Sequence, residues 1–172
     1  GSKWQQFVRT EIFDKAAMTE SDITDGSHPE TGVAHGYEKQ NGGFKELDYG
    51  EEPTFCAAGN GGIWCSVTDL HKYYLALQKP AFLNKEIIVG SMQIKRFENW
   101  SSEKEPNNGY SWFITKTING LERIGHTGSQ GGFRANFQFI PEKKILSFFT
   151  TTCFSLRTFK QNKLTFLILG CN

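Results

Sequence analysis

Apolar residues in the first part of the chain recur at helical spacing. Four of them, at i, i+3, i+4 and i+8, fall on one stripe of an amphipathic helix: Trp4, Phe7, Val8 and Ile12. The polar residues 19–31 include Gly26 and Pro29 and indicate a loop. Residues 33–40 and 44–49 then flank Asn41-Gly42-Gly43, which predicts a β-hairpin.

A second helical pattern follows the glycine-rich segment 59–62. Ser66 is a good N-cap residue, and Asp69, three positions later, is expected to reach back in a weak form of the capping box. Pro80 is expected to end this helix, and a further helix is predicted from Asn84 to about Phe97. The helix-spaced apolar positions are Leu70, Tyr73, Tyr74 and Leu77. The polar residues 101–108 read as a loop.

From Gly109 onward the apolar period changes to two, which is typical of strands. Tyr110, Trp112 and Ile114 alternate with polar neighbours, and Asn119-Gly120 predicts a hairpin turn. Residues 133–139 and 144–152 predict two more strands, joined at Pro141. Residues 109–152 are therefore expected to form an antiparallel meander. With the preceding helices, this gives an α+β fold.

The length and charge of the chain narrow the classes of function. The first two residues resemble a cloning scar, and residues 3–172 are long enough for one domain but short for two. Lys and Arg total 19 against 18 for Asp and Glu, so no excess of positive charge favours nucleic acid as a partner. The apolar run 164–169 is too short to cross a membrane.

The cysteines and histidines do not predict a metal site. The four cysteines form no CxxC pair, and no two of the four histidines are close in sequence. Buried or surface thiols are the simplest interpretation, and the sequence leaves open whether any pair forms a disulfide. The cysteines are Cys56, Cys65, Cys153 and Cys171.

The segment from Gly125 to Phe133, GHTGSQGGF, carries the clearest candidate chemistry. It reads as a strand that ends in a glycine-dense turn, with His126 and Thr127 just before the turn. Glycines let another backbone approach closely, and an exposed strand edge can hydrogen-bond an extended substrate. An ordinary turn with a surface histidine is the structural alternative, because short glycine-rich motifs are weak signals.

His126-Thr127-Gly128 resembles the third motif, Lys-Thr-Gly, of serine β-lactamases and penicillin-binding proteins, in the His-Thr-Gly form common among esterase and peptidase relatives. Other segments are similar to the family in the same order, from about Phe7 to Thr152. Ala17 and Ser111 stand where the family usually has glycine. The other similar segments are 12–19 (IFDKAAMT), 34–37 (AHGY), 61–70 (GGIWCSVTDL), 108–112 (NGYSW) and 132–141 (Gly-Phe followed by Pro).

The resemblance implies the C-terminal part of a β-lactamase/transpeptidase-like fold and a role for each residue of the motif. His126 and Thr127 would contact the polar or carboxylate end of the substrate from an edge strand, and Gly128 would let the substrate backbone lie close. The backbone N–H of Ser129 would donate to the oxyanion, a contact worth about 3–4 kcal/mol. The parent enzyme would hydrolyse an ester, amide or β-lactam bond through an acyl-enzyme, without metal or organic cofactor. By the same analogy it would work in the periplasm or elsewhere outside the cytoplasm, although the sequence itself leaves localisation unknown.

The family's nucleophile motifs are missing from this sequence. There is no Tyr-x-Asn, and the one Ser-x-x-Lys string, Ser101 to Lys104, falls in a polar loop. With 11 Ser and 14 Lys, about one such string is expected by chance. The fragment alone is therefore expected to be inactive without the N-terminal half of its parent. A non-catalytic binding or interaction module on the same fold is the alternative, and the upstream sequence would separate the two.

The same reading predicts self-association. If N-terminal elements normally cover the sheet, their removal would expose a large apolar patch around residues 133–149, which contain several phenylalanines.

Overall fold

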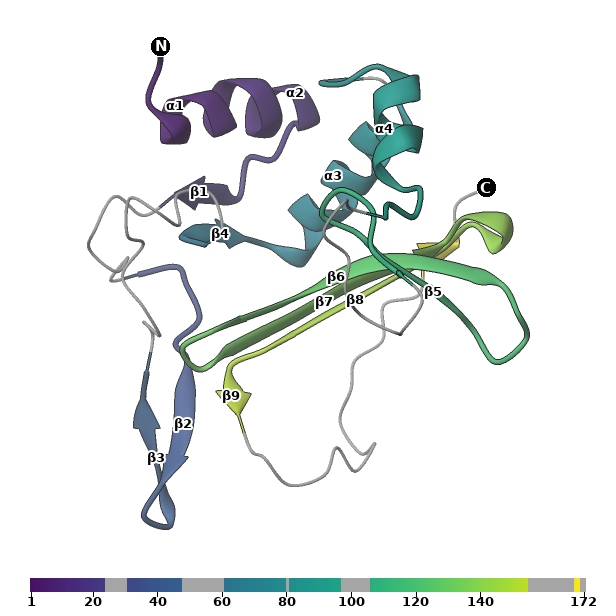
Figure 1. Ribbon diagram of the computed structural model, residues 1–172. Coiled ribbons are helices and arrows are strands. Elements are labelled where there is room, and N and C mark those ends of the chain that lie inside the picture. Colours follow the sequence, from purple (N-terminus) through teal and green to yellow (C-terminus); the bar gives the residue numbers. More distant parts are fainter. Residues whose placement is uncertain (24–30, 48–60, 80, 97–105, 155–168, 171–172) are drawn as a thin grey trace. The chain divides into compact units, whose positions relative to one another are not determined.

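The computed structural model describes residues 1–23, 31–47, 61–79, 81–96, 106–154 and 169–170 (Figure 1). It has the α+β composition that the sequence predicted, with helices first and an antiparallel sheet after them. The contacts divide the chain into two compact units. The first comprises the described residues within Gly1–Lys85, Ser129–Arg134 and Thr151–Thr158; the second comprises those within Glu86–Gly128, Ala135–Thr150 and Phe159–Asn172.

The first unit begins with one continuous helical stretch, as the apolar stripe predicted. It consists of α1 (Trp4–Val8), a π-helical turn (Arg9–Phe13) and α2 (Asp14–Ala16). The i→i+5 turn shifts the stripe, so that Phe13 is buried while Phe7 is 54% exposed. The core of the unit comprises Phe13, Ala16, Met18, Ile23 and Ala76, with Trp4, Val8, Ile12 and Tyr73 among the residues packed against it.

This first helix ends on a residue that glycine usually supplies. Ala17 adopts a left-handed conformation with φ +56°. Its N–H donates to the Asp14 carbonyl at 3.1 Å, and the Met18 N–H donates to Phe13 at 2.8 Å, the pair of bonds that defines a Schellman motif. Ala17 is also one of the two positions where the sequence departs from the family's glycine. The departure therefore carries a backbone cost of about 1–2 kcal/mol.

Short strands and one long helix complete the first unit. Strand β1 (Ser21–Ile23) pairs antiparallel with β4 (Ile63–Cys65), and α3 (Val67–Gln78) follows β4 directly. The predicted hairpin is present but shorter than expected, as β2 (Tyr37–Gln40) and β3 (Gly43–Glu46). Its turn, Asn41-Gly42, has φ +49° and +84°, the two positive values of a type I′ turn. β2 also pairs in parallel with β9 (Cys153–Phe154).

The second unit contains most of the meander and nearly all of one helix, while Ser129–Arg134, at the turn end of β6 and β7, belong to the first unit. The sheet order is β10-β8-β7-β6-β5 (Figure 1), with β5 (Phe113–Lys116), β6 (Glu122–Gln130), β7 (Phe133–Ile140), β8 (Ile145–Thr151) and β10 (Leu169–Gly170). A 3₁₀ turn at Pro141–Lys143 joins β7 to β8. Helix α4 (Lys85–Ser91) is shorter than the predicted 84–97: after Gly90, the Ser91 carbonyl accepts from Tyr110 instead of continuing a helix.

The alternation predicted from Gly109 begins later than expected. Tyr110 is exposed and precedes β5, and Ser111 has φ +61°, so the chain bends before the strand starts at Phe113. Ser111 is the second position at which the family's glycine is replaced, and it too has a left-handed backbone. In the hairpin turn that follows, only Gly120, at φ +80°, has positive φ; Asn119 does not.

The predicted apolar patch around residues 133–149 is wrong. Every large apolar side chain in this stretch is buried or half-buried. Trp112 explains part of this, because its ring lies 5.8 Å from Phe139 and 6.3 Å from Phe137. Leu146, Phe148 and Phe139 form part of the core of the second unit together with Ile88, Ile114 and Ile124.

Candidate functional site

Strand β6 runs through the whole His-Thr-Gly segment. The sequence predicted that the strand would end in a turn just after His126 and Thr127, whereas β6 continues to Gln130 and the turn is Gly131-Gly132. Gly131, at φ +52°, supplies the turn conformation. Gly128 lies within the strand, without positive φ, and therefore has no part in the turn.

The register of β5 leaves the second half of β6 beyond its partner. β5 pairs with Glu122 through Gly125, and Phe113 opposite Gly125 is the last pair. His126, Thr127, Gly128 and Ser129 follow in chain order, and all four are exposed. In the part of the chain that the structure describes, this stretch lies at the margin of the sheet where β5 has ended.

Three glycines in and beside β6 differ in whether the fold needs them. A Cβ on Gly125 would overlap the Phe137 carbonyl oxygen, and a Cβ on Gly132 would overlap the backbone nitrogen of Tyr37. A Cβ on Gly128 would meet only the Ala135 methyl, at 3.6 Å, which is an ordinary contact. The packing of the described residues requires glycine at 125 and 132 but not at 128.

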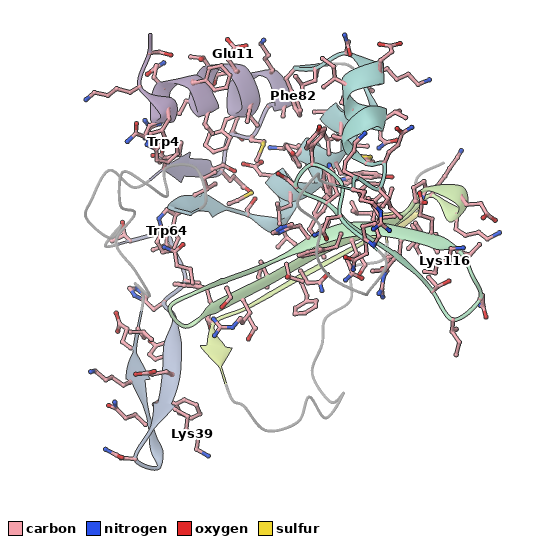
Figure 2. All side chains as sticks on the ribbon, in the orientation of Figure 1. Trp4, Glu11, Lys39, Trp64, Phe82 and Lys116 are labelled. Carbon is pink, nitrogen blue, oxygen red and sulfur yellow. The ribbon has the colours of Figure 1, made fainter. Side chains whose placement is uncertain are left out.

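The turn end of the β6–β7 hairpin is held tightly within the first unit. Gly132 donates to the Leu47 carbonyl at 2.7 Å, and its Cα lies against Gly36 so closely that neither position has room for a side chain. Trp64, labelled in Figure 2, packs edge-on against Phe133 with ring centroids 5.6 Å apart. Ser129 lies three residues before Gly132 in the same unit.

A small hollow opens beside β5 and β6 in the second unit. Its volume is about 190 Å³. The His126 ring stacks on Phe113, with centroids 4.9 Å apart and planes 9° from parallel. The Arg123 Nε donates to the Thr115 hydroxyl at 3.0 Å. The lining residues are Asn107, Phe113, Thr115, Arg123, Gly125, His126, Thr127 and Gln138.

Asp69 is the most buried charged side chain described, with no exposed surface. Ser66 caps α3 as predicted, since its hydroxyl accepts from the Asp69 N–H at 3.0 Å. The Asp69 carboxylate was expected to reach back to the cap, but this prediction is wrong: it accepts from the Glu20 N–H and the Ser21 hydroxyl, both at 2.7 Å. The Lys72 ammonium lies 2.7 Å from its other oxygen.

Burial and hydrogen bonding act in opposite directions on the Asp69 carboxyl. Burial by itself raises the pKa of Asp69, but hydrogen bonds from Lys72, Ser21 and the Glu20 backbone outweigh it and hold the pKa below its usual value. Asp69 is therefore a charged anchor between the entry to β1 and the start of α3. Sequence reasoning could not find its partners, because Glu20 and Ser21 are almost fifty residues away.

Of the remaining sequence candidates, only Cys65 has a side chain among the described residues. Cys65 is a free thiol whose pKa is raised by burial, while the side chains of Cys56, Cys153 and Cys171 lie outside the described residues. The string Ser101 to Lys104 also lies outside them. Within the described ranges, no three His, Cys, Asp or Glu side chains cluster in a way that could hold a metal ion. No described helix is long and apolar enough to cross a membrane.

A sequence profile of the Beta-lactamase family matches residues 1–169. The chain belongs to this family. Membership agrees with the order of the segments noted in the sequence and with the mixed helix and antiparallel-sheet structure. A search of curated protein sequences gave no match.

Solved structures share the fold of this family member. An octameric penicillin-binding protein homologue from Pyrococcus abyssi superposes with a TM-score of 0.72 at 24% identity, over 89% of this chain and 34% of its own. A penicillin-binding protein from Bacillus halodurans gives 0.62 at 20% identity, over 83% and 42%. A D-stereospecific amidohydrolase from a Streptomyces species gives 0.62 at 20%, over 81% and 41%. The chain thus spans well under half the length of these structures.

Proposed function

We propose that this chain is the C-terminal portion of a β-lactamase-like serine hydrolase and supplies its substrate-binding strand. The parent forms an acyl-enzyme on a serine upstream of these residues and hydrolyses an ester, amide or β-lactam bond. His126 and Thr127 contact the polar end of the substrate, and the Ser129 N–H donates one hydrogen bond to the oxyanion. Family membership and the shared fold support this assignment.

The observation that carries the proposal is the contrast at Gly128. This glycine lies in an exposed stretch of β6, and the described packing leaves room there for a methyl group. Its lack of a side chain therefore serves something outside the described packing. An extended ligand laid along β6 accounts for it, because a side chain at 128 would keep the ligand backbone away from the strand.

Self-association is part of the proposal. The Pyrococcus abyssi homologue is octameric, which supports an oligomeric state for this protein too. Exposed phenylalanines between 133 and 149 do not account for it, because these side chains are buried or half-buried. Light scattering on the purified chain measures the mass directly, and a monomer at high concentration would count against this part.

Labelling with an active-site probe tests the proposal. The chain alone and the longer gene product are each treated with a fluorophosphonate and, separately, with a penicillin, and their intact masses are measured. The chain alone should gain no adduct, and the longer product should gain one on an upstream serine followed by x-x-Lys. An adduct on a serine of the chain itself would overturn the proposal. Failure of the longer product to label would favour the non-catalytic binding module.

A further inference from the structure

We propose that Gln130 is a positioning residue, which fixes the end of β6 where Ser129 presents its N–H. The inference rests on the proposed function, in which that N–H donates to the oxyanion. Gln130 is half-buried and is the last residue of β6, directly after Ser129. A donor that stabilises charge formed during the reaction must already point at the oxyanion before the reaction begins. What holds Ser129 in place therefore affects the rate.

The turn after β6 directs the Ser129 N–H away from β7. Gly131 has positive φ and Gly132 does not, the pattern of a two-residue type II′ turn. Such a turn closes on a hydrogen-bonded pair of residues, here Gln130 and Phe133. Because the bonding direction alternates along an antiparallel strand, the N–H of Ser129 points to the side opposite β7. The β6–β7 ladder therefore does not use this donor.

The side chain of Gln130 lies against the α-carbon of Gly61, two residues before β4 begins. A Cβ on Gly61 would come within 2.5 Å of the Gln130 Oε1, 3.2 Å of its Cδ and 3.3 Å of its Nε2. The whole planar amide therefore covers this position. Gly61 has no positive φ, so its own backbone conformation does not require glycine. What glycine provides here is room for the Gln130 amide.

The other side of the turn rests on the same segment of the chain. Phe133 packs edge-on against Trp64, with ring centroids 5.6 Å apart. Gly61 and Trp64 thus contact the two residues that flank the turn, and all four belong to the first unit. If the Gln130 side chain were removed, only the Phe133 side of the turn would keep its contact with residues 61–64. The residue that loses support is the one next to Ser129.

Gln130 acts through the backbone of Ser129 and not through a contact of its own with the ligand. Neighbouring side chains of a strand point to opposite faces, so the amide of Gln130 lies on the face opposite the Ser129 hydroxyl. A change at Gln130 should therefore affect the orientation of the donor and the rate of acylation. It should leave the affinity for the ligand nearly unchanged.

Backbone relaxation measured by NMR on the 172-residue chain tests the positioning directly. Ser129 should have an order parameter of about 0.85 in the wild type, as rigid backbone does, and in Gln130→Ala it should fall towards about 0.6. Gln40→Ala is the matched control, because Gln40 is exposed and is also the last residue before a two-residue turn. It should leave Ser129 as in the wild type. An unchanged order parameter in folded Gln130→Ala would overturn the inference.

Gly61→Ala tests the same contact from the other side. The new methyl would displace the Gln130 amide, so Ser129 should become mobile although Gln130 is still present. The double variant should be no more mobile than Gln130→Ala alone, because the two changes remove one contact. Gln130→Met keeps a long unbranched side chain over Gly61 and should restore most of the order. Additive losses in the double variant would refute the contact as the cause.

Acylation of the longer gene product by a fluorophosphonate tests the link to the reaction. Gln130→Ala should lower the maximal rate at least about tenfold and change the half-saturating probe concentration less than about twofold. Gln40→Ala should label as the wild type does. An unchanged maximal rate, or a loss confined to the half-saturating concentration, would refute the inference. If the wild-type product does not label at all, the proposed function fails, and the order parameters of the chain still decide whether Gln130 positions Ser129.

Discussion

The two ends of the glycine-rich segment differ in whether the packing of the chain requires glycine there. At the turn end, Gly132 is closed in by Gly36, Tyr37 and Leu47, so the fold itself demands glycine. In the strand before it, a Cβ on Gly128 would meet only the Ala135 methyl, at an ordinary distance, next to residues that carry the candidate chemistry. A sequence motif dense in glycine thus contains one glycine that holds the chain together and one that keeps a surface free. The sequence alone does not separate these two kinds of glycine. The difference follows from the atoms that surround each Cα.

Gly132→Ala should give the largest effect. The new methyl would overlap the Tyr37 nitrogen, and both neighbours are backbone that cannot rotate away, so we expect a loss of about 3 kcal/mol in the free energy of unfolding. Urea denaturation measures it. The control is Gly42→Ala, where no atom lies within 4 Å and only the positive φ opposes the change. A Gly132→Ala midpoint equal to wild type would contradict the closed turn.

Asp69→Asn should destabilise the first unit by about 2–4 kcal/mol, because the amide cannot pair with Lys72 or accept as strongly from Ser21. The control is Asp14→Asn, an exposed change on the first helix, which should lie within about 0.5 kcal/mol of wild type. Equal denaturation midpoints for the two variants would show that Asp69 does not anchor β1 to α3.

Asp69 also predicts how stability depends on pH. Its folded pKa is lowered, so its contribution is complete above the ordinary aspartate value of 3.8 and is lost as the pH falls from there through the folded pKa. Wild type should therefore lose stability more steeply below about pH 4 than Asp69→Asn. Parallel curves for the two proteins, measured by urea midpoint against pH, would show that this carboxylate is not linked to folding.

Ala17→Gly and Ser111→Gly should each stabilise the chain, by about 1 kcal/mol or less. Both residues have a left-handed backbone, where glycine avoids the steric cost that a side chain meets, although its freer unfolded state offsets part of the gain. Ala34→Gly is the control, because Ala34 is exposed without positive φ and should lose stability instead. A lower thermal midpoint in both glycine variants would contradict the backbone assignment.

Gly128→Ala should give the smallest effect on stability, within about 0.5 kcal/mol of wild type. The added methyl would meet only Ala135 at an ordinary distance. Gly125→Ala, three residues earlier on the same strand, is the matched change at a closed position and should be destabilising. Equal losses of stability in the two variants would contradict the distinction between a glycine that the packing requires and one that it does not.

Sequence periodicity predicted the elements better than their ends. The first helix and strands β7 and β8 follow from local apolar spacing, which a helix or strand must satisfy to bury one face. The start of β5 could not be predicted, because the chain bends at Ser111 through a left-handed backbone conformation. A serine in the sequence does not indicate that conformation. Helix α4 ends early because Ser91 bonds to Tyr110, a partner outside the helix.

The candidate site was located in part by the sequence. The motif drew attention to residues 126–129, and those residues lie together in an exposed strand. Arg123 and Thr115 were missed, since they carry no motif and meet only through the β5–β6 register. The two departures from the family's glycines, Ala17 and Ser111, were visible in the sequence. Only the backbone angles gave them a physical meaning.

The most direct test of the central claim is the rate at which a fluorophosphonate acylates the longer gene product when Gly128 is replaced by alanine. The account predicts a rate at least about tenfold lower, with an unchanged urea midpoint, because the methyl interferes with the ligand and not with the fold. Ala135→Gly, which alters the neighbouring strand without narrowing the ligand's approach, should label at close to the wild-type rate. Wild-type labelling by Gly128→Ala, or a loss of rate matched by a loss of stability, would contradict the assignment of β6 as the substrate strand.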